Sequence, residues 1–136
     1  MLSFDVERAL AELTSIMLRQ PLPGLRLRDI DAEARHVVVA EAGIGRNTTL
    51  YEAEKKLQNG ALRFSVAAEA ALRRFDALCA YSPASAARDR ATPGAQIEPR
   101  IWREALVEFH IAARRARTAW DMYYSVCSVV QAVRAR

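Results

Sequence analysis

The stretch WREALVEFHIAARRARTAWDMYY (102–124) gathers residue types that could bind or process a nucleic acid. Its tryptophans, Trp102 and Trp120, could stack on bases, and its arginines could hold phosphates through paired hydrogen bonds. Between them stands His110, and histidine is the usual group for proton transfer near neutral pH. Such chemistry requires the rings and the charged groups to lie on one face of the same element.

Helical spacing separates the aromatic residues from the basic ones. At about 100° per residue, the apolar positions fall within about 40° of Trp102, and the basic positions lie about 60–120° further round. We therefore predict that the apolar stripe packs in a core, and that the basic residues form a flank exposed to water. The stripe consists of Trp102, Leu106, Phe109, Ala113, Ala116, Trp120 and Cys127, and the flank of Arg103, His110, Arg114 and Arg117.

Arg103 and His110, with residues 104–109 between them, resemble the Arg-x(4–6)-His signature of HEPN-type helical ribonucleases. The resemblance would imply that these two residues act on the phosphate and the 2′-hydroxyl of RNA. Glu104 stands where the family has another polar residue, and the rest of the family pattern is absent. No nucleophile elbow, zinc-protease motif or dinucleotide fingerprint occurs in the sequence, so we expect no enzyme and no catalytic residue.

The sequence also lacks the spacing of a metal or cofactor site. Cys79 and Cys127 form no CxxC pair, and His36 and His110 are far apart. Glu33 and His36 form one ExxH, but a helical di-iron site needs this pattern twice, with further carboxylates. We therefore expect no metal, no cofactor and no small-molecule substrate, and we expect both cysteines to be small buried residues.

Size and charge restrict the class of protein. The chain of 136 residues is long enough for one domain with one core, and we expect residues 1–136 to form a single domain. No apolar run approaches the roughly 20 residues of a membrane helix, and the start of the chain lacks the features of a signal peptide. We expect a cytoplasmic protein. The net charge of +4, with only Lys55 and Lys56 as lysines, weakly favours acidic partners.

The first third of the chain predicts one short helix and one short hairpin. Val6, Leu10, Leu13 and Met17 follow helical spacing within residues 4–19, with Ser3 as the expected cap and PLPG (21–24) as the stop. Residues 25–30 and 35–40 alternate apolar and polar positions and include β-branched valines, which favours a β-hairpin. A helix over 31–41 is the alternative, and the sequence leaves the choice open.

Two long helices are predicted for the rest. The first is expected over Thr49–Tyr81, with Thr49 and Glu52 in capping-box spacing and a possible kink at Gly60. Residues 82–96 have the composition of a linker, and we expect a flexible loop over about 82–97. The second helix begins near Glu98–Pro99 and continues to about Val133. The stripe of the first helix is Leu50, Leu57, Ala61, Phe64, Ala68, Leu72, Phe75 and Cys79.

Alternating large and small residues on both stripes predict that the long helices pack as an antiparallel pair. The fold class is therefore mainly all-α. The last helix has a second apolar stripe about 180° from the first. A helix with two apolar faces must be covered on both, so we predict an oligomer or partner interface there, with self-association favoured. The stripe consists of Met122, Val126, Val129 and Val133.

Positive residues also repeat along the first long helix, where Lys56, Arg63 and Arg74 lie within about 20° of one another. Together with the flank of Arg103, His110, Arg114 and Arg117, they could follow a DNA or RNA backbone without reading its sequence. The stretch GIGRNTT (43–49) could hold an anion at a helix start, although it lacks the P-loop pattern.

Two interpretations follow. The first is a non-enzymatic, chaperone-like helical assembly or adaptor subunit of a bacterial complex, and the alternative is a small basic subunit that binds nucleic acid. PGLRLRDID (23–31) and LQNGALRFSVAAEAALRRFDAL (57–78) resemble collinear stretches of flagellar proximal-rod proteins. The Asn-rich segment of that family is absent and residues 83–136 have no counterpart, so no residue receives a role from it. The partner, the pathway and the oligomeric state stay open.

Overall fold

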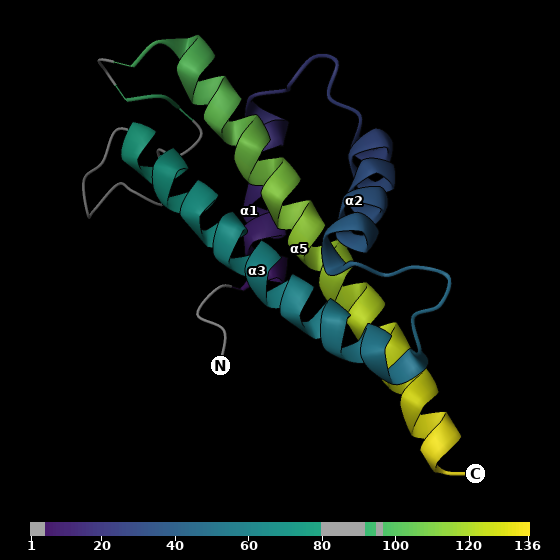
Figure 1. Cartoon of the computed structure of the whole chain (residues 1–136). Helices are drawn as coiled ribbons and strands as arrows, with labels where there is room; N and C mark the ends of the chain where they lie inside the picture. Colours follow the sequence, from purple (N-terminus) through teal and green to yellow (C-terminus); the bar gives the residue numbers. More distant parts are fainter. Residues whose placement is uncertain (1–4, 80–91, 95–96) are drawn as a thin grey trace.

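The computed structural model describes residues 5–79, 92–94 and 97–136, and these form an all-α fold (Figure 1). Its helices are α1 (Val6–Arg19), α2 (Leu27–Ala42), α3 (Leu50–Leu78) and α5 (Pro99–Arg134). The predicted all-α class is confirmed. No helix within these ranges has a stretch long and apolar enough to cross a membrane. Most of the linker predicted over 82–97 lies outside the described residues.

The β-hairpin predicted over residues 25–40 is wrong, because α2 occupies this stretch. A hairpin would place Val37 and Val39 on one buried face, but Val38 between them is the fully buried valine. The buried residues of α2 instead repeat every four positions, as they do on one face of a helix. Burial of this stripe outweighs the modest β propensity of valine. The stripe consists of Ile30, Ala34, Val38 and Ala42.

Helix α1 ends where the sequence predicts but begins from a different cap. The carboxylate of Asp5 accepts a hydrogen bond from the backbone N–H of Arg8 at 3.1 Å, so Asp5 is the cap rather than Ser3. The helix ends at Arg19, with Gln20 as its C-cap directly before PLPG. Its buried face consists of Ala9, Leu10, Leu13 and Ile16, while Val6 and Met17 are only half-buried.

The two long helices form an antiparallel pair, as predicted (Figure 1). Helix α3 begins at the predicted cap, where the hydroxyl of Thr49 accepts from the backbone N–H of Glu52. Contacts between the helices run in opposite directions along the chain: Phe75 meets Trp102, Arg74 meets Glu108 and Ser65 meets Trp120. The small residues Ala61, Ala68, Ala113 and Ala116 are fully buried in this pair, so the two backbones can approach closely.

Helices α1 and α2 pack on α5 as well, so α5 is the central helix of the bundle (Figure 1). The largest rings of the core meet where α3 and α5 pack: the Phe75 ring is tilted against that of Trp102 at 5.6 Å and stacks on that of Phe109 at 6.0 Å. Further toward the N-terminus of α3, the last residue of α2, Ala42, lies against Gly60. Coverage by α2 therefore ends at the middle of α3.

Candidate functional site

His110 lies inside the bundle rather than on the exposed flank that the sequence predicts. Its side chain is 1% exposed, and neither ring nitrogen has a hydrogen-bond partner among the described residues. The pKa of His110 is lowered from 6.5 to about 4: burial is the largest cause, the charge of Arg114 also lowers it, and the charge of Asp31 opposes the shift. The prediction from helical spacing is wrong here because α1 and α2 pack on α5 in addition to α3.

Two arginines in the middle of α5 are paired with carboxylates of α2. Arg114 forms a two-pronged ion pair with Asp31, with Nε and Nη2 at 2.8 and 3.0 Å from the two carboxylate oxygens. The Arg114 side chain is only 16% exposed. Beside it, Arg115 lies 3.4 Å from a carboxylate oxygen of Glu33. These charges fasten α2 to α5, which leaves little of the Arg114 guanidinium accessible to a phosphate.

The three basic residues predicted as a flank of α3 are also engaged within the fold. Lys56 Nζ and Arg63 Nη2 donate hydrogen bonds to backbone carbonyl oxygens at or just after the end of α2, at 3.1 and 3.3 Å. Arg74 forms an ion pair of 2.8 Å with Glu108 of α5. Each of the three side chains is accessible to water, but each also has a partner within the fold.

Arg103 and His110 do not meet at one open site. Arg103 is exposed and lines a hollow where the loop after α1 passes the start of α5, together with Leu22 and Pro23. His110 is enclosed by the bundle. A ribonuclease pair of the HEPN type would need both side chains to reach the same phosphodiester, and this arrangement does not favour it.

The tryptophans divide between the core and its edge. Trp102 is 1% exposed, as predicted for a core residue. Trp120 is half-buried: its indole Nε1–H donates to the hydroxyl of Ser65 at 2.8 Å, and its ring stacks on that of Tyr124 at 5.8 Å. The ring of Trp120 therefore reaches the surface in part, where the sequence predicts complete burial.

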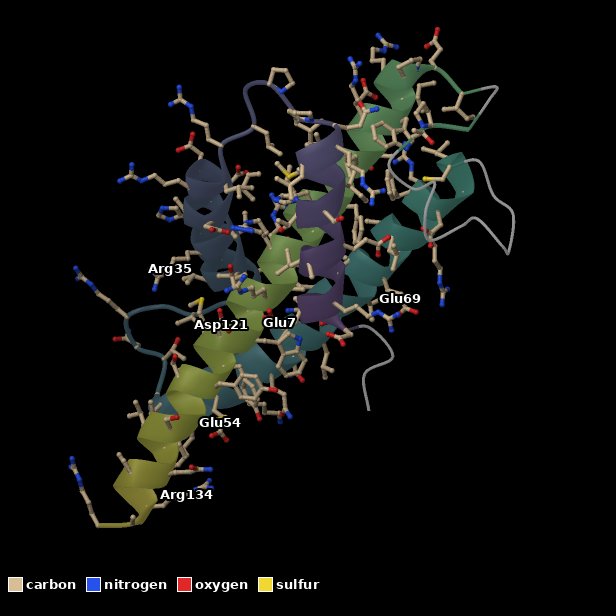
Figure 2. All side chains as sticks on the ribbon, turned by 180° about the vertical axis from the view of Figure 1, so that it is seen from behind. Glu7, Arg35, Glu54, Glu69, Asp121 and Arg134 are labelled. Carbon is tan, nitrogen blue, oxygen red and sulfur yellow. The ribbon has the colours of Figure 1, made fainter. Side chains whose placement is uncertain are left out.

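The side chains of the predicted interface stripe become more exposed toward the C-terminal end of α5. Met122 and Val126 are half-buried, whereas Val129 and Val133 are 50% and 39% exposed. The last turns of α5, with Arg134, project beyond the other helices (Figures 1 and 2). Only Val130 is buried after Ala119. The stripe is thus covered at its beginning and open at its end.

A cleft of about 430 Å³ continues this stripe between α2, α3 and α5. Leu57, Met122 and Val126 form its apolar floor, and Asp31, Arg35 and Asp121 stand at its edge. The cleft and the exposed valines together form one apolar strip along α5, which we call the stripe surface: Met122, Val126, Val129 and Val133.

A second, smaller cavity of about 240 Å³ lies on another flank of α5, where α1 begins. Figure 2 shows Glu7 of α1 beside Asp121 of α5 at this place. Nothing in the sequence indicates that residues 5–7 and 117–124 meet, so this site could not be predicted from it. The cavity, called here the α1–α5 cavity, is lined by Asp5, Glu7, Arg117, Trp120, Asp121 and Tyr124.

Comparisons with known proteins give no matching family model, no similar curated protein and no similar solved structure. The resemblances to HEPN-type ribonucleases and to flagellar proximal-rod proteins therefore receive no support from them. Within the described ranges, no three His, Cys, Asp or Glu side chains are grouped so that they could hold a metal ion. Cys79 is buried, as predicted, whereas Cys127 is only half-buried.

Proposed function

We propose that this chain is a non-enzymatic helical assembly or adaptor subunit of a bacterial protein complex, and that it binds a partner helix along the stripe surface. The observation that supports this proposal is the exposure of Val129 and Val133, 50% and 39%, in direct continuation of Met122 and Val126. An amphipathic partner helix docks into a groove of this kind through apolar side chains at three- and four-residue spacing.

The position of the surface supports protein contact for a second reason. Val129 and Val133 lie about 40° apart on the helix, so both can enter one contact with a partner. The cleft beside them has Leu57, Met122 and Val126 as its floor. A partner would therefore bury the accessible parts of Met122 and Val126 together with the two exposed valines, and burial of apolar area is the main favourable term in association.

Binding of a nucleic-acid backbone is the second candidate, and we rank it after protein contact because several of its basic residues already form ion pairs. Binding to a phosphate backbone requires accessible basic groups, which displace the counterions condensed on the nucleic acid. Arg114 is held by Asp31 and Arg74 by Glu108, so phosphates would have to compete with carboxylates that are already in place.

Capture from the native host tests the proposed function. We expect the wild-type chain to retain a specific partner, or a second copy of itself, in both untreated and nuclease-treated lysates. The double variant Val129→Glu and Val133→Glu should lose this partner while keeping its helical circular dichroism, because both valines are exposed. Val66→Glu is the matched control, since Val66 is an exposed valine (66%) on α3.

Retention of the same proteins by the double variant would contradict the proposal. If wild-type capture disappears on nuclease treatment, nucleic-acid binding becomes the leading function instead.

A further inference from the structure

We infer that the partner helix on the stripe surface is α5 of a second copy of this chain, packed antiparallel about a two-fold axis that passes between Cys127 and Ser128. The inference rests on the proposed function, because it names the occupant of that surface. Three features of α5 support it: the spacing of the stripe, the position of the cleft and the charges at the two ends of the stripe.

The spacing of the stripe surface is self-complementary. Its four apolar residues follow one another at steps of four, three and four, which is the spacing of a coiled-coil seam. Because these steps are the same from either end, a two-fold axis at the midpoint pairs Met122 of one copy with Val133 of the other. The same axis pairs Val126 with Val129. Every layer of the contact therefore buries an apolar side chain from each copy, as a symmetric contact between identical surfaces requires.

The cleft of about 430 Å³ provides room for the projecting end of a second copy. It lies at the N-terminal end of the stripe surface, where Met122 and Val126 line it. The exposed valines, Val129 and Val133, lie at the other end, where α5 projects beyond the other helices (Figure 1). Antiparallel pairing brings the valines of each copy to the cleft of the other, whereas parallel pairing would leave both clefts without them.

The residues that flank the stripe surface allow two α5 helices to approach closely. Ser125 and Ala132 lie on one flank, about 70–90° from the centre of the stripe, and both are small and exposed. Val130 on the other flank is buried within its own chain. The distance between two packed helices depends on the size of the side chains at the contact, so small flanking residues favour close packing.

The charges at the two ends of the stripe surface favour antiparallel over parallel pairing. Arg134 and Arg136 are exposed at the C-terminal end. The other end carries both signs of charge, because Asp31 and Asp121 border the cleft together with Arg35. Parallel pairing would place the arginine ends of two copies side by side, and like charges across an interface disfavour association. Antiparallel pairing instead places each arginine end beside carboxylates.

The length of the contact sets the strength that we expect. From Met122 to Val133 the helix rises by about 17 Å, and so short a contact belongs with small, weak interfaces that bury less than about 1,200 Å² in total. We therefore expect a dissociation constant on the order of 10–100 μM.

Analytical ultracentrifugation of the full chain, from about 5 to 500 μM, measures this dissociation constant. We expect the wild type to dimerise within this range and the double variant Val129→Glu with Val133→Glu to stay monomeric. Val66→Glu, at an exposed valine of α3, is the matched control and should dimerise as the wild type does. A wild type that is monomeric at about 500 μM, or a double variant that dimerises equally well, would overturn the inference.

Charge pairs at exposed positions test the two-fold axis itself. In the antiparallel pair, Ser125 of one copy lies across from Ala132 of the other. Ser125→Glu with Ala132→Lys should therefore add two ion pairs to the dimer, and Ser125→Glu with Ala132→Glu should add two repulsions. We expect the dissociation constant of the second variant to exceed that of the first by about fivefold or more. Equal dissociation constants for these two variants would also overturn the inference.

The same charges at Ser128 and Ala135 are the matched control. These two residues are exposed and seven positions apart, as Ser125 and Ala132 are, but they lie about 130–150° from the centre of the stripe. Glu and Lys at these positions should give the same dissociation constant as Glu at both.

Failure of the inference can be told apart from failure of the proposed function. If the wild type is monomeric while Val129→Glu with Val133→Glu still abolishes capture of a host protein, the inference falls and the proposed function stands. If the dimer behaves as expected but the double variant captures the same host proteins as the wild type, the inference stands and the adaptor role of this surface falls.

Discussion

The two halves of α5 belong to one continuous helix but have opposite environments. From Trp102 to Ala119 the helix is enclosed by α1, α2 and α3, and even its histidine is 1% exposed. From Trp120 onward only Val130 is buried, and Tyr124 and Val129 are 60% and 50% exposed. The composition does not explain this difference, because both halves carry apolar residues on more than one face.

Coverage by the shorter helices explains it. Helix α2 ends at Ala42 over the middle of α3, and α1 begins at Val6 beside Trp120. The second half of α5 therefore has α3 as its main partner, and the apolar side chains on its other faces stay accessible. An apolar stripe becomes a core or a binding surface according to which neighbouring helix reaches it.

The largest expected effect comes from removing one apolar side chain from each half of α5. Phe109→Ala should lower the free energy of unfolding by about 3–5 kcal/mol, because it opens a cavity beside Phe75 in the closed half. Val129→Ala in the open half should change it by less than about 0.5 kcal/mol. Urea unfolding followed by circular dichroism measures both. Similar losses for the two variants would mean that the halves do not differ in packing.

A smaller effect is expected from the ion pairs. Asp31→Ala leaves the guanidinium of Arg114, which is 16% exposed, without its partner, and should cost about 2 kcal/mol. Glu108→Ala removes the partner of Arg74, whose side chain is 59% exposed, and should cost no more than about 0.5 kcal/mol in the same urea experiment. Equal losses of stability in the two variants would show that the ion pair of Arg114 is no more enclosed than that of Arg74.

The third effect depends on pH. Because the pKa of His110 is lowered to about 4 in the folded chain, only the unfolded chain takes up its proton as the pH falls from 6.5. The folded state should lose about 1–2 kcal/mol by pH 5 from this group, and the loss should be complete near pH 4. His110→Leu should remove this part of the pH dependence and leave stability at pH 7 equal or higher, since it removes two unpaired nitrogens.

His36→Leu is the control for that measurement, because His36 is the exposed histidine, on α2. If His110→Leu and the wild type have the same profile between pH 7 and pH 5, His110 is not the group responsible.

Much of the long-helix architecture could be predicted because it depends on local chemistry. The cap at Thr49, the stop before Pro21 and the start at Pro99 each depend on the hydrogen-bonding groups of a few neighbouring residues. The hairpin prediction was wrong at Val37–Val39. There the β propensity of valine competes with burial of the apolar stripe of α2, and this burial requires contact with α3 and α5. The α1–α5 cavity could not be predicted, because it joins residues more than 100 positions apart in the sequence.

The amino-acid order by itself determined where the long helices begin and which side of each is apolar, since these properties follow from backbone hydrogen bonds and a repeat of 3.6 residues. Only the tertiary structure decided which charges and rings reach water. His110 and Arg114 lie on a polar flank by spacing, yet they are enclosed or paired because α1 and α2 pack there. Whether a residue is buried depends on the elements packed around it, and those packed around α5 come from distant parts of the chain.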